Sequence, residues 1–202
     1  MRKPSLNVVC VVALCSLSAF AVEPGETVKP VELRNYDDSA APIPDFGKKI
    51  IALFYGDADV SDMNDPMADA LKAKEFDKTV YRGLGVANMQ DSKAPNFLIR
   101  SIVKGKVEKY KATILLDQNL SLATAWGFGD CNNTSVFIVI GADEKVKYIH
   151  KGPIRGAEVE AATKLVEGLV NELKGTTGAA AKPSEPAIAP AAAGAAPVAP
   201  TP

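Results

Sequence analysis

The chain has 202 residues, 47% of them hydrophobic, and its 23 basic and 24 acidic residues leave a formal net charge of −1. A nearly neutral chain is not typical of nucleic-acid-binding proteins, which place clustered Lys and Arg side chains against phosphates. The composition therefore predicts a globular protein with no nucleic-acid partner.

Residues 1–21 have the pattern of a secretory signal peptide. Arg2 and Lys3 come first, an uncharged and mostly apolar run from Leu6 to Phe20 follows, and Ala21 ends a small-residue cleavage site. The alternative, a retained membrane anchor, would need roughly 20 apolar residues and flanking stop-transfer charges. We predict cleavage after Ala21, a periplasmic or secreted location, and no membrane span after cleavage.

Cleavage would remove two of the three cysteines and two basic residues. Cys131 would then be the only cysteine, and 21 basic against 24 acidic residues would give a net charge of −3. A secreted chain with one cysteine has no internal disulfide. The mature domain must therefore be stabilised by its hydrophobic core.

The composition changes abruptly at Gly175, after which Ala, Pro and Gly dominate and Lys182 and Glu185 are the only charged residues. Such a segment has few large side chains to bury, so burial cannot offset the entropy lost on ordering. We predict one domain over residues 22–174 and a disordered tail over residues 175–202. The tail would be a spacer, a tether or only a solubilising extension.

Strand and helix patterns alternate through the first half of the domain. Residues 49–55 form an apolar run that is typical of a central parallel strand. A helix follows, with Ser61 or Asp62 as its N-cap, and residues 80–87 are predicted as the next strand. Pro95 then opens a second helix with an apolar face. That face is formed by Leu98, Ile99, Ile102 and Val103.

The second half continues the alternation. Residues 113–116 are predicted as a short buried strand, and residues 136–140 and 146–150 as an antiparallel hairpin. Apolar residues at helical spacing over 159–173 predict the last helix. Because crossover helices place consecutive strands in parallel, the sequence predicts a central sheet whose first strands are parallel, with the hairpin in the same sheet.

Three segments resemble the thioredoxin-like superfamily of thiol-disulfide oxidoreductases and peroxiredoxins. Residues 47–54 resemble the strand that leads into the active site of these enzymes. Residues 114–127 resemble their segment of strand, Asp, polar turn and aromatic-Gly, and residues 137–146 resemble their final hairpin. The resemblance covers residues 31–173 and implies an α/β, thioredoxin-like fold with a central mixed sheet flanked by helices.

The chain is more closely similar to the YtfJ-like periplasmic proteins, a thioredoxin-fold group whose function is obscure. The shared features are Trp126, the polar pair Thr134-Ser135 before a hydrophobic strand, and Lys151-Gly152 before the last helix. The resemblance therefore implies a fold more than an activity.

The residues that give the superfamily its redox chemistry are missing. The position of the Cys-x-x-Cys motif holds Asp59-Val60-Ser61-Asp62, and the position of the family's cis-proline holds Ser135. A carboxylate cannot form a disulfide. A cis bond before a non-proline residue costs about 2.5–4 kcal/mol, so a trans bond is expected before Ser135. Asp59, Asp62 and Ser135 are thus degenerate active-site positions, and the favoured role of Asp62 is a helix cap.

Four carboxylates close together in sequence permit a hypothesis of metal binding. They belong to Asp57, Asp59, Asp62 and Asp65. Calcium binds carboxylate clusters, and the start of this segment resembles an EF-hand loop. The positions that need Gly and Glu in an EF-hand are instead Asp62 and Ala68. A solvated acidic loop without metal is therefore favoured, and weak calcium binding is the alternative.

Cys131 is predicted to lie in a polar loop at the same sheet edge as the Asp cluster. No Arg, Lys or His adjoins it in sequence to lower the pKa of its thiol. We therefore predict no catalytic residue and no cofactor, and a non-catalytic binding or accessory module for an unknown envelope protein or small ligand. The alternative, from a different class, is a thiol oxidoreductase or peroxidase-like protein that acts through Cys131 alone.

Overall fold

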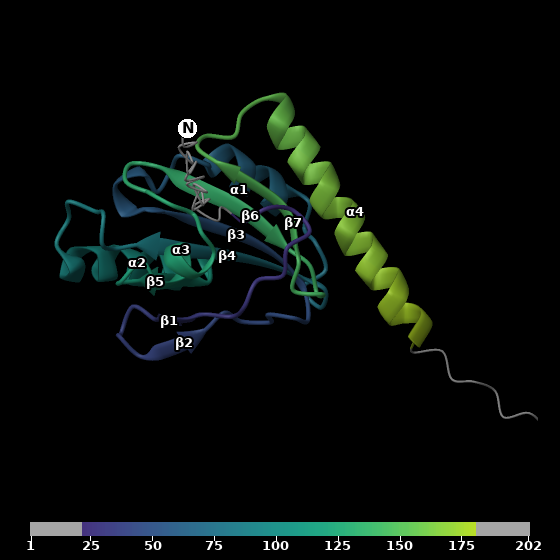
Figure 1. Ribbon diagram of the computed structural model, residues 1–202, viewed down its shortest axis with the longest axis horizontal. Helices are drawn as coiled ribbons and strands as arrows, with labels where there is room; N and C mark the ends of the chain where they lie inside the picture. The colour runs from purple at the N-terminus through teal and green to yellow at the C-terminus, as the bar shows by residue number, and fades with distance from the viewer. Residues whose placement is uncertain (1–21, 181–202) are drawn as a thin grey trace, which may run out of the picture.

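In residues 22–180, the part of the chain that the computed structural model describes, strands and helices alternate largely as the sequence predicts (Figure 1). The strands are β1 (Glu32–Arg34), β2 (Ala40–Pro42), β3 (Ile50–Asp57), β4 (Tyr81–Asn88), β5 (Ile114–Asp117), β6 (Ser135–Ile140) and β7 (Val146–Lys151). The helices are the 3-10 helix η1 (Ala58–Val60) and the α-helices α1 (Asp65–Ala73), α2 (Asn96–Tyr110), α3 (Ser121–Ala125) and α4 (Ala157–Ala180). The predicted signal peptide and residues 181–202 lie outside the described residues.

All seven strands join one sheet in the order β2-β1-β5-β4-β3-β6-β7. β3 pairs in parallel with β4, and β4 with β5, because α1 and α2 cross over between them. β6 pairs antiparallel with β3, and β7 with β6. The predicted mixed central sheet and its antiparallel hairpin are confirmed.

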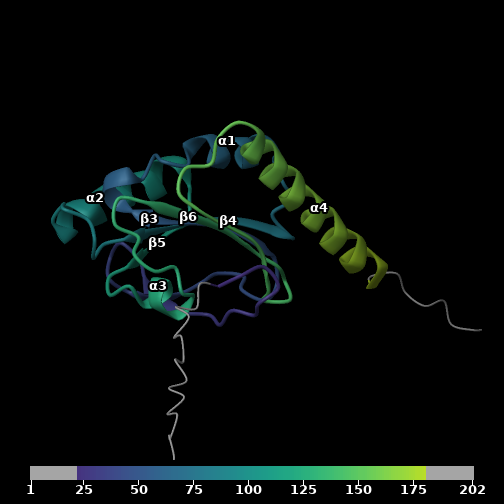
Figure 2. The same ribbon diagram turned by 45° about the horizontal axis from the view of Figure 1, so that its top comes forward.

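Helices cover both faces of this sheet (Figure 2). α1, α2 and α4 lie on one face, where Met67 and Val166 belong to the same buried cluster. α3 and the N-terminal segment lie on the other face, where Leu122 and Val28 share a second cluster. Because both faces are covered, every residue of β6 is buried and β3 is nearly all apolar. This burial explains why continuous apolar runs predicted the central strands.

The sequence pattern does not predict the hairpin of β1 and β2 at one edge of the sheet. Each strand has three residues in an exposed-buried-exposed pattern, so only Leu33 and Ala41 point into the core. One buried residue in a strand is too little for a periodicity to be recognised.

The start of α1 differs from the prediction. The helix begins at Asp65, and its N-cap is Asn64 rather than Ser61 or Asp62. Residues 61–63 form a turn between η1 and α1. The helix-cap role predicted for Asp62 is therefore wrong, because the first turn of α1 lies farther along the chain than the Asp-rich pattern indicates.

α2 forms where predicted, but only half of its predicted apolar face is buried. Ile99 and Val103 are 2% and 5% exposed and cluster with Leu116 of β5. Leu98 and Ile102 are 43% and 51% exposed. The four residues form two rows along the helix, each with a spacing of four residues, and only one row faces the sheet.

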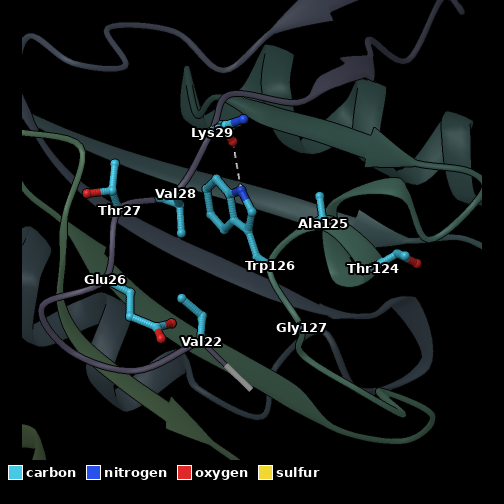
Figure 3. A pocket seen from close by; sticks show the side chains of 9 residues that line it. All are labelled: Val22, Glu26, Thr27, Val28, Lys29, Thr124, Ala125, Trp126 and Gly127. Carbon is cyan, nitrogen blue, oxygen red and sulfur yellow. Dashed lines mark hydrogen bonds between the residues drawn. The ribbon is translucent and has the colours of Figure 1, made fainter. Parts of the chain in front are cut away.

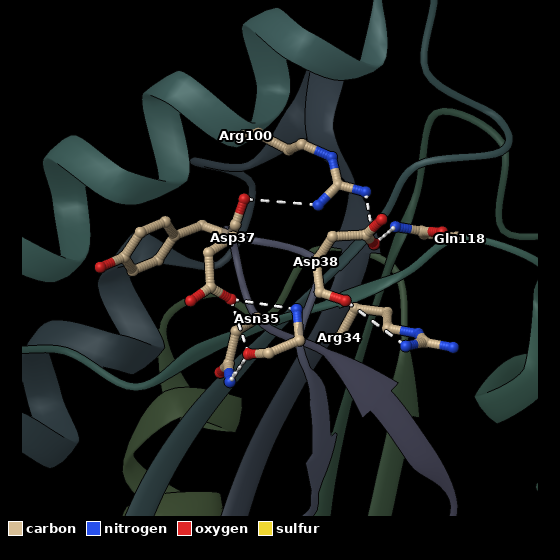
Figure 4. A network of polar contacts seen from close by, with 8 residues as sticks. Arg34, Asn35, Asp37, Asp38, Arg100 and Gln118 are labelled. Carbon is tan, nitrogen blue, oxygen red and sulfur yellow. Dashed lines mark hydrogen bonds and ion pairs between the residues drawn. The ribbon is translucent and has the colours of Figure 1, made fainter.

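A polar network joins α2 to the β1–β2 turn (Figure 4). Arg100 donates hydrogen bonds to the carbonyl oxygen of Tyr36 (3.3 Å) and to the carboxylate of Asp38 (2.8 Å). Gln118 donates to the same carboxylate (2.8 Å). The hydrogen bond from Arg100, followed by that from Gln118, holds the pKa of Asp38 below its usual value. Rotation of α2 that buried its exposed row would break these contacts.

The last helix is longer than predicted. α4 ends at Ala180, beyond the predicted domain boundary at Lys174. Thr176 Oγ1 donates a hydrogen bond to the carbonyl oxygen of Glu172 (3.0 Å), so the helix continues into the Ala-rich and Gly-rich segment. Neither α4 nor any other helix in the described part of the chain is long and apolar enough to span a bilayer.

The side chain of Asn64 links the start of α1 to the β7–α4 connection, and we expect this link to stabilise the fold. Its buried side chain donates to the carbonyl oxygen of Gly152 (3.1 Å) and accepts from the N–H of Ile154 (2.8 Å). Asn64→Ala leaves both groups without this partner, so we expect the free energy of unfolding to fall by about 1–3 kcal/mol. Urea denaturation measures the change. The matched control Asn35→Ala removes a solvent-exposed hydrogen bond to Ser39 and should change stability far less; equal losses would contradict the assigned role.

Candidate functional site

Three buried polar residues end the three parallel strands at one edge of the sheet. Asp57 is the last residue of β3, Asn88 of β4 and Asp117 of β5, and the strand register places them side by side in one row. Their exposed fractions are 1%, 0% and 0%. The carboxyl ends of parallel strands are where open α/β sheets place their functional groups. This edge is therefore the candidate site.

Asp57 and Asn88 each hold a loop at this edge. The carboxylate of Asp57 accepts hydrogen bonds from the backbone N–H groups of Asp59 and Asn133, both at 2.9 Å. The side-chain amide of Asn88 donates to the carboxylate of Asp91 (2.6 Å). The first pair of bonds connects η1 to the loop before β6, and the second stabilises the turn that follows β4.

Asp117 holds the start of α3. Its carboxylate accepts from the backbone N–H groups of Ser121 (2.8 Å) and Leu122 (3.0 Å), and from the phenol of Tyr55 (3.2 Å). Burial, followed by the nearby charge of Asp117, raises the pKa of Tyr55, so its phenol stays protonated and donates. Among the described residues, no buried side-chain nitrogen or oxygen lacks a partner. The row of polar strand ends is thus engaged in the protein's own structure.

Asn88 and Asp117 are site residues that the sequence pattern does not identify. A signal was present, because each is a polar residue at the end of a predicted strand. What the sequence lacks is the pairing register, which places these two residues beside Asp57.

Asp59, at the first degenerate position, is exposed but hydrogen-bonded. Its carboxylate accepts from the hydroxyl of Ser92 (2.7 Å) and from the backbone N–H of Lys93 (3.0 Å). The Lys93 N–H, followed by the Ser92 hydroxyl, holds the pKa of Asp59 below its usual value. Asp59 therefore connects the β3–α1 connection to the β4–α2 connection.

The four carboxylates of the acidic segment do not converge. Asp62 is exposed in a turn, and Asp65 is exposed at the first residue of α1. The carboxylates of Asp57 and Asp59 face backbone N–H groups. In residues 22–180, no group of three or more His, Cys, Asp or Glu side chains is arranged to hold a metal ion. The geometry gives the calcium hypothesis no support.

Ser135, at the degenerate proline position, is the first residue of β6 and is 6% exposed. Its hydroxyl donates to the carbonyl oxygen of Tyr55 on the neighbouring strand (3.0 Å). A Cβ atom on Gly56 would lie 3.2 Å from this hydroxyl, so the close pairing of β3 and β6 favours glycine there. No cis peptide bond occurs among the described residues, which confirms the trans bond expected before Ser135.

Cys131 lies in a loop, but its side chain is in the core. The residue is 1% exposed and belongs to the same buried cluster as Tyr55 and Phe128. Burial raises the pKa of the thiol, and the positive charge of Lys151 offsets part of the effect. The nucleophilic thiolate is therefore disfavoured and shielded from solvent. The predicted polar surroundings of Cys131 are wrong for its side chain.

A shallow cavity of about 360 Å³ lies beside Trp126, one of the residues on which the family resemblance rests (Figure 3). The indole is 2% exposed, and its Nε1 donates to the carbonyl oxygen of Lys29 (2.8 Å). Val22, Glu26 and Thr124 also line the cavity. Because the indole N–H already has a partner within the chain, Trp126 acts here as packing surface and as a link to the N-terminal segment.

Residues 34–169 match the family described as "Bacterial protein of unknown function (YtfJ_HI0045)". The chain belongs to this family. The predicted similarity to the YtfJ-like proteins is therefore confirmed, and the match includes the three polar strand ends, both degenerate Asp positions and Cys131. No protein with a curated description matches the sequence.

The fold of this YtfJ_HI0045 protein is shared with solved structures described as thiol-disulfide enzymes. A thiol:disulfide interchange protein DsbE from Chlorobium tepidum is 14% identical, with a TM-score of 0.53, over 74% of this chain and 99% of that one. The C-terminal domain of a thiol-disulfide oxidoreductase from Bacteroides thetaiotaomicron is 16% identical, with a TM-score of 0.53, over 76% and 99%. A protein disulfide isomerase from Bacteroides thetaiotaomicron is 12% identical, with a TM-score of 0.56, over 77% and 95%. At these identities the likeness shows the thioredoxin-like fold alone.

The contacts of Asp59 predict a measurable pKa change. Because its folded-state pKa is lowered, its stabilising effect is present above the unfolded value of about 3.9 and is lost as the pH falls through the folded value. Ser92→Ala should raise the pKa of Asp59, although not to the unfolded value, because the Lys93 N–H remains. NMR titration of the carboxyl signals measures the pKa of Asp59 in the parent chain and in the variant. Asp77, with a pKa lowered to about 2 by Thr79, is the control that should not move; an unchanged Asp59 pKa in the variant would refute the assigned contact.

The burial of Cys131 predicts slow alkylation. In the native protein, iodoacetamide should label Cys131 much more slowly than in the guanidinium-unfolded protein at the same pH, and the native rate should rise only above the ordinary thiol pKa of about 8.5. Mass spectrometry over a time course gives both rates for a chain that begins at Val22 and so lacks Cys10 and Cys15, with Cys131→Ser as the unlabelled control. Rapid native labelling near pH 6 would contradict the burial and the raised pKa of this thiol.

Proposed function

We propose that this protein is an exported thioredoxin-fold protein without thiol redox activity, which acts as a binding or accessory module in the cell envelope. The observation that carries the proposal is that Asp59, at the expected position of the first motif cysteine, has a structural role. Asp59 has no thiol chemistry, and its carboxylate is engaged with Ser92 and Lys93.

The lack of an accessible thiol in the described residues supports the same function. Thiol-disulfide exchange needs a thiolate that reaches a disulfide of the substrate. Cys131 is the one cysteine in the described residues, and its side chain is 1% exposed with a raised pKa. Asp62, at the position of the second motif cysteine, is another carboxylate. In the described residues, this edge of the sheet can hold loops in place, but it offers no accessible thiol.

The proposed location rests on the sequence of residues 1–21, with its basic start, uncharged apolar run and small-residue cleavage site. A periplasmic or secreted protein would begin at Val22, whose side chain is 8% exposed in the folded domain. Purification from the envelope fraction and mass spectrometry of the N-terminus test this part of the proposal.

The alternative is a thiol oxidoreductase or peroxidase-like protein that uses Cys131 alone. It requires an opening that exposes the thiol, because in the folded structure the side chain packs with Tyr55 and Phe128. The positive charge of Lys151 is the feature that would favour a thiolate, and it is outweighed by burial.

Two activity assays separate these functions. With dithiothreitol as reductant, the protein should reduce insulin and consume hydrogen peroxide no faster than dithiothreitol alone, and Cys131→Ser should give the same rates. The physical reason is that Asp59 has no thiol and the thiol of Cys131 is buried, so neither residue can attack a disulfide of insulin or the O–O bond of peroxide. A rate above background that Cys131→Ser abolishes would overturn the proposal in favour of single-cysteine chemistry.

A further inference from the structure

The exposed large hydrophobic side chains of the described residues gather on one helix. Phe97, Leu98 and Ile102 are 74%, 43% and 51% exposed, and all three lie in the first two turns of α2. Ile99 and Val103 fill the core-facing side of the same turns. A contiguous exposed apolar patch of this kind marks an interaction surface. We call Phe97, Leu98 and Ile102 the α2 patch.

The segment around the α2 patch carries a strong positive charge. Residues 93–111 contain six basic residues and one acidic residue, a net charge of +5 in a chain whose total is −1. The basic residues are Lys93, Arg100, Lys104, Lys106, Lys109 and Lys111, and the acidic residue is Glu108. The charge of the remaining chain is therefore −6. α2 itself has a net charge of +3, because Lys93 and Lys111 lie outside it, and its Arg100 is paired with Asp38.

Basic side chains border the solvent-facing side of α2. At about 100° per residue, Ser101 and Gly105 lie at the centre of that side, and Lys104 and Lys106 lie on its two borders. The side chain of Lys104 is 56% exposed and lies 4.0 Å from the carboxylate of Glu108, an exposed pair that water can separate. Lys106 makes one long hydrogen bond to the hydroxyl of Ser61 (3.4 Å). Long lysine side chains of this kind can extend past an apolar stripe to reach anionic groups.

We propose that α2 docks this protein on the surface of an anionic phospholipid bilayer. The α2 patch enters the headgroup region, while Lys104 and Lys106 contact lipid phosphates on either side of it. Apolar residues on one face of a helix, flanked by lysines, are the features of helices that lie in the membrane interface. The proposal rests on the proposed function as a binding module and names the partner of that module.

Charge and shape favour a bilayer over other occupants of the α2 patch. In a symmetric pairing of two copies through the α2 patch, two segments of +5 would face each other and repel. Residues 181–202 contain one Lys and one Glu and so offer no complementary negative charge. α2 lies at the periphery of the molecule, at the end opposite the end of α4 (Figures 1 and 2). A peripheral helix with small residues at its centre fits a plane surface, whereas a peptide ligand needs a groove.

Vesicle flotation tests the proposal with the exported chain, after mass spectrometry has shown that it begins at Val22. The protein should float with phosphatidylcholine vesicles that contain 30% phosphatidylglycerol and remain unbound with pure phosphatidylcholine. Lys104→Ala/Lys106→Ala should weaken partitioning about fivefold for each lysine removed. Phe97→Ser/Ile102→Ser should weaken it tenfold or more, because apolar side chains no longer enter the interface.

A matched control separates a specific surface from general charge. Lys145→Ala/Lys164→Ala removes the same charge from two exposed positions outside α2 and should leave partitioning unchanged. The variants should keep a melting temperature close to that of the parent chain, because Phe97, Ile102 and Lys104 are exposed and the half-buried Lys106 makes only one long hydrogen bond. Failure to float with phosphatidylglycerol vesicles, or equal weakening by the control pair, would overturn the proposal.

The outcome also separates this proposal from the proposed function. If the protein neither floats nor reduces insulin, docking on lipid is wrong and a non-redox module with a protein partner stands. If it floats through α2 and also reduces insulin through Cys131, the docking surface stands and the non-redox function is wrong. Cross-linking of α2 to an acidic envelope protein, without flotation, would overturn the choice of a bilayer.

Discussion

The hydrogen bonds at the ends of β3, β4 and β5 determine the shape of the candidate site. Asp57, Asn88 and Asp117 are fully buried, yet each holds a loop or a helix start through its side chain. Hydrogen bonds from backbone N–H groups to a carboxylate are stronger than those between neutral groups. Loss of one such acceptor would leave buried N–H groups unpaired, at about 1–3 kcal/mol each. The apolar strands supply most of the burial, and these three residues decide how the chain leaves them.

Much of the fold could be predicted from the sequence because its central strands are covered on both faces. β3 and β6 appear as continuous apolar runs for that reason. β1 and β2 could not be predicted, since each contributes one buried residue. The apolar face of α2 was predicted as one stripe, although the sheet covers only Ile99 and Val103. Periodicity shows which residues share a side of a helix, but not how wide a stripe the neighbouring strand can cover.

The candidate site was harder to predict, because its contacts join loops far apart in sequence. Asp57 binds Asn133, and Asp59 binds Ser92. From sequence alone, an Asp before a helix can equally be a cap, a metal ligand or a solvated residue. Cys131 shows the same limit, since its neighbours Asn132 and Asn133 are exposed while its own side chain is buried. The direction of one side chain in a loop is set by tertiary packing, which local polarity does not encode.

Asp59 is linked through hydrogen bonds to the segment that leads into α2. Asp59 accepts hydrogen bonds from Ser92 and Lys93, and α2 begins a few residues later at Asn96. Arg100 fixes the next turn of the helix against Tyr36 and Asp38. A thiol is a weak acceptor and could not replace the carboxylate in the first of these contacts. The carboxylate at position 59 therefore helps to set the position of the helix that carries the α2 patch.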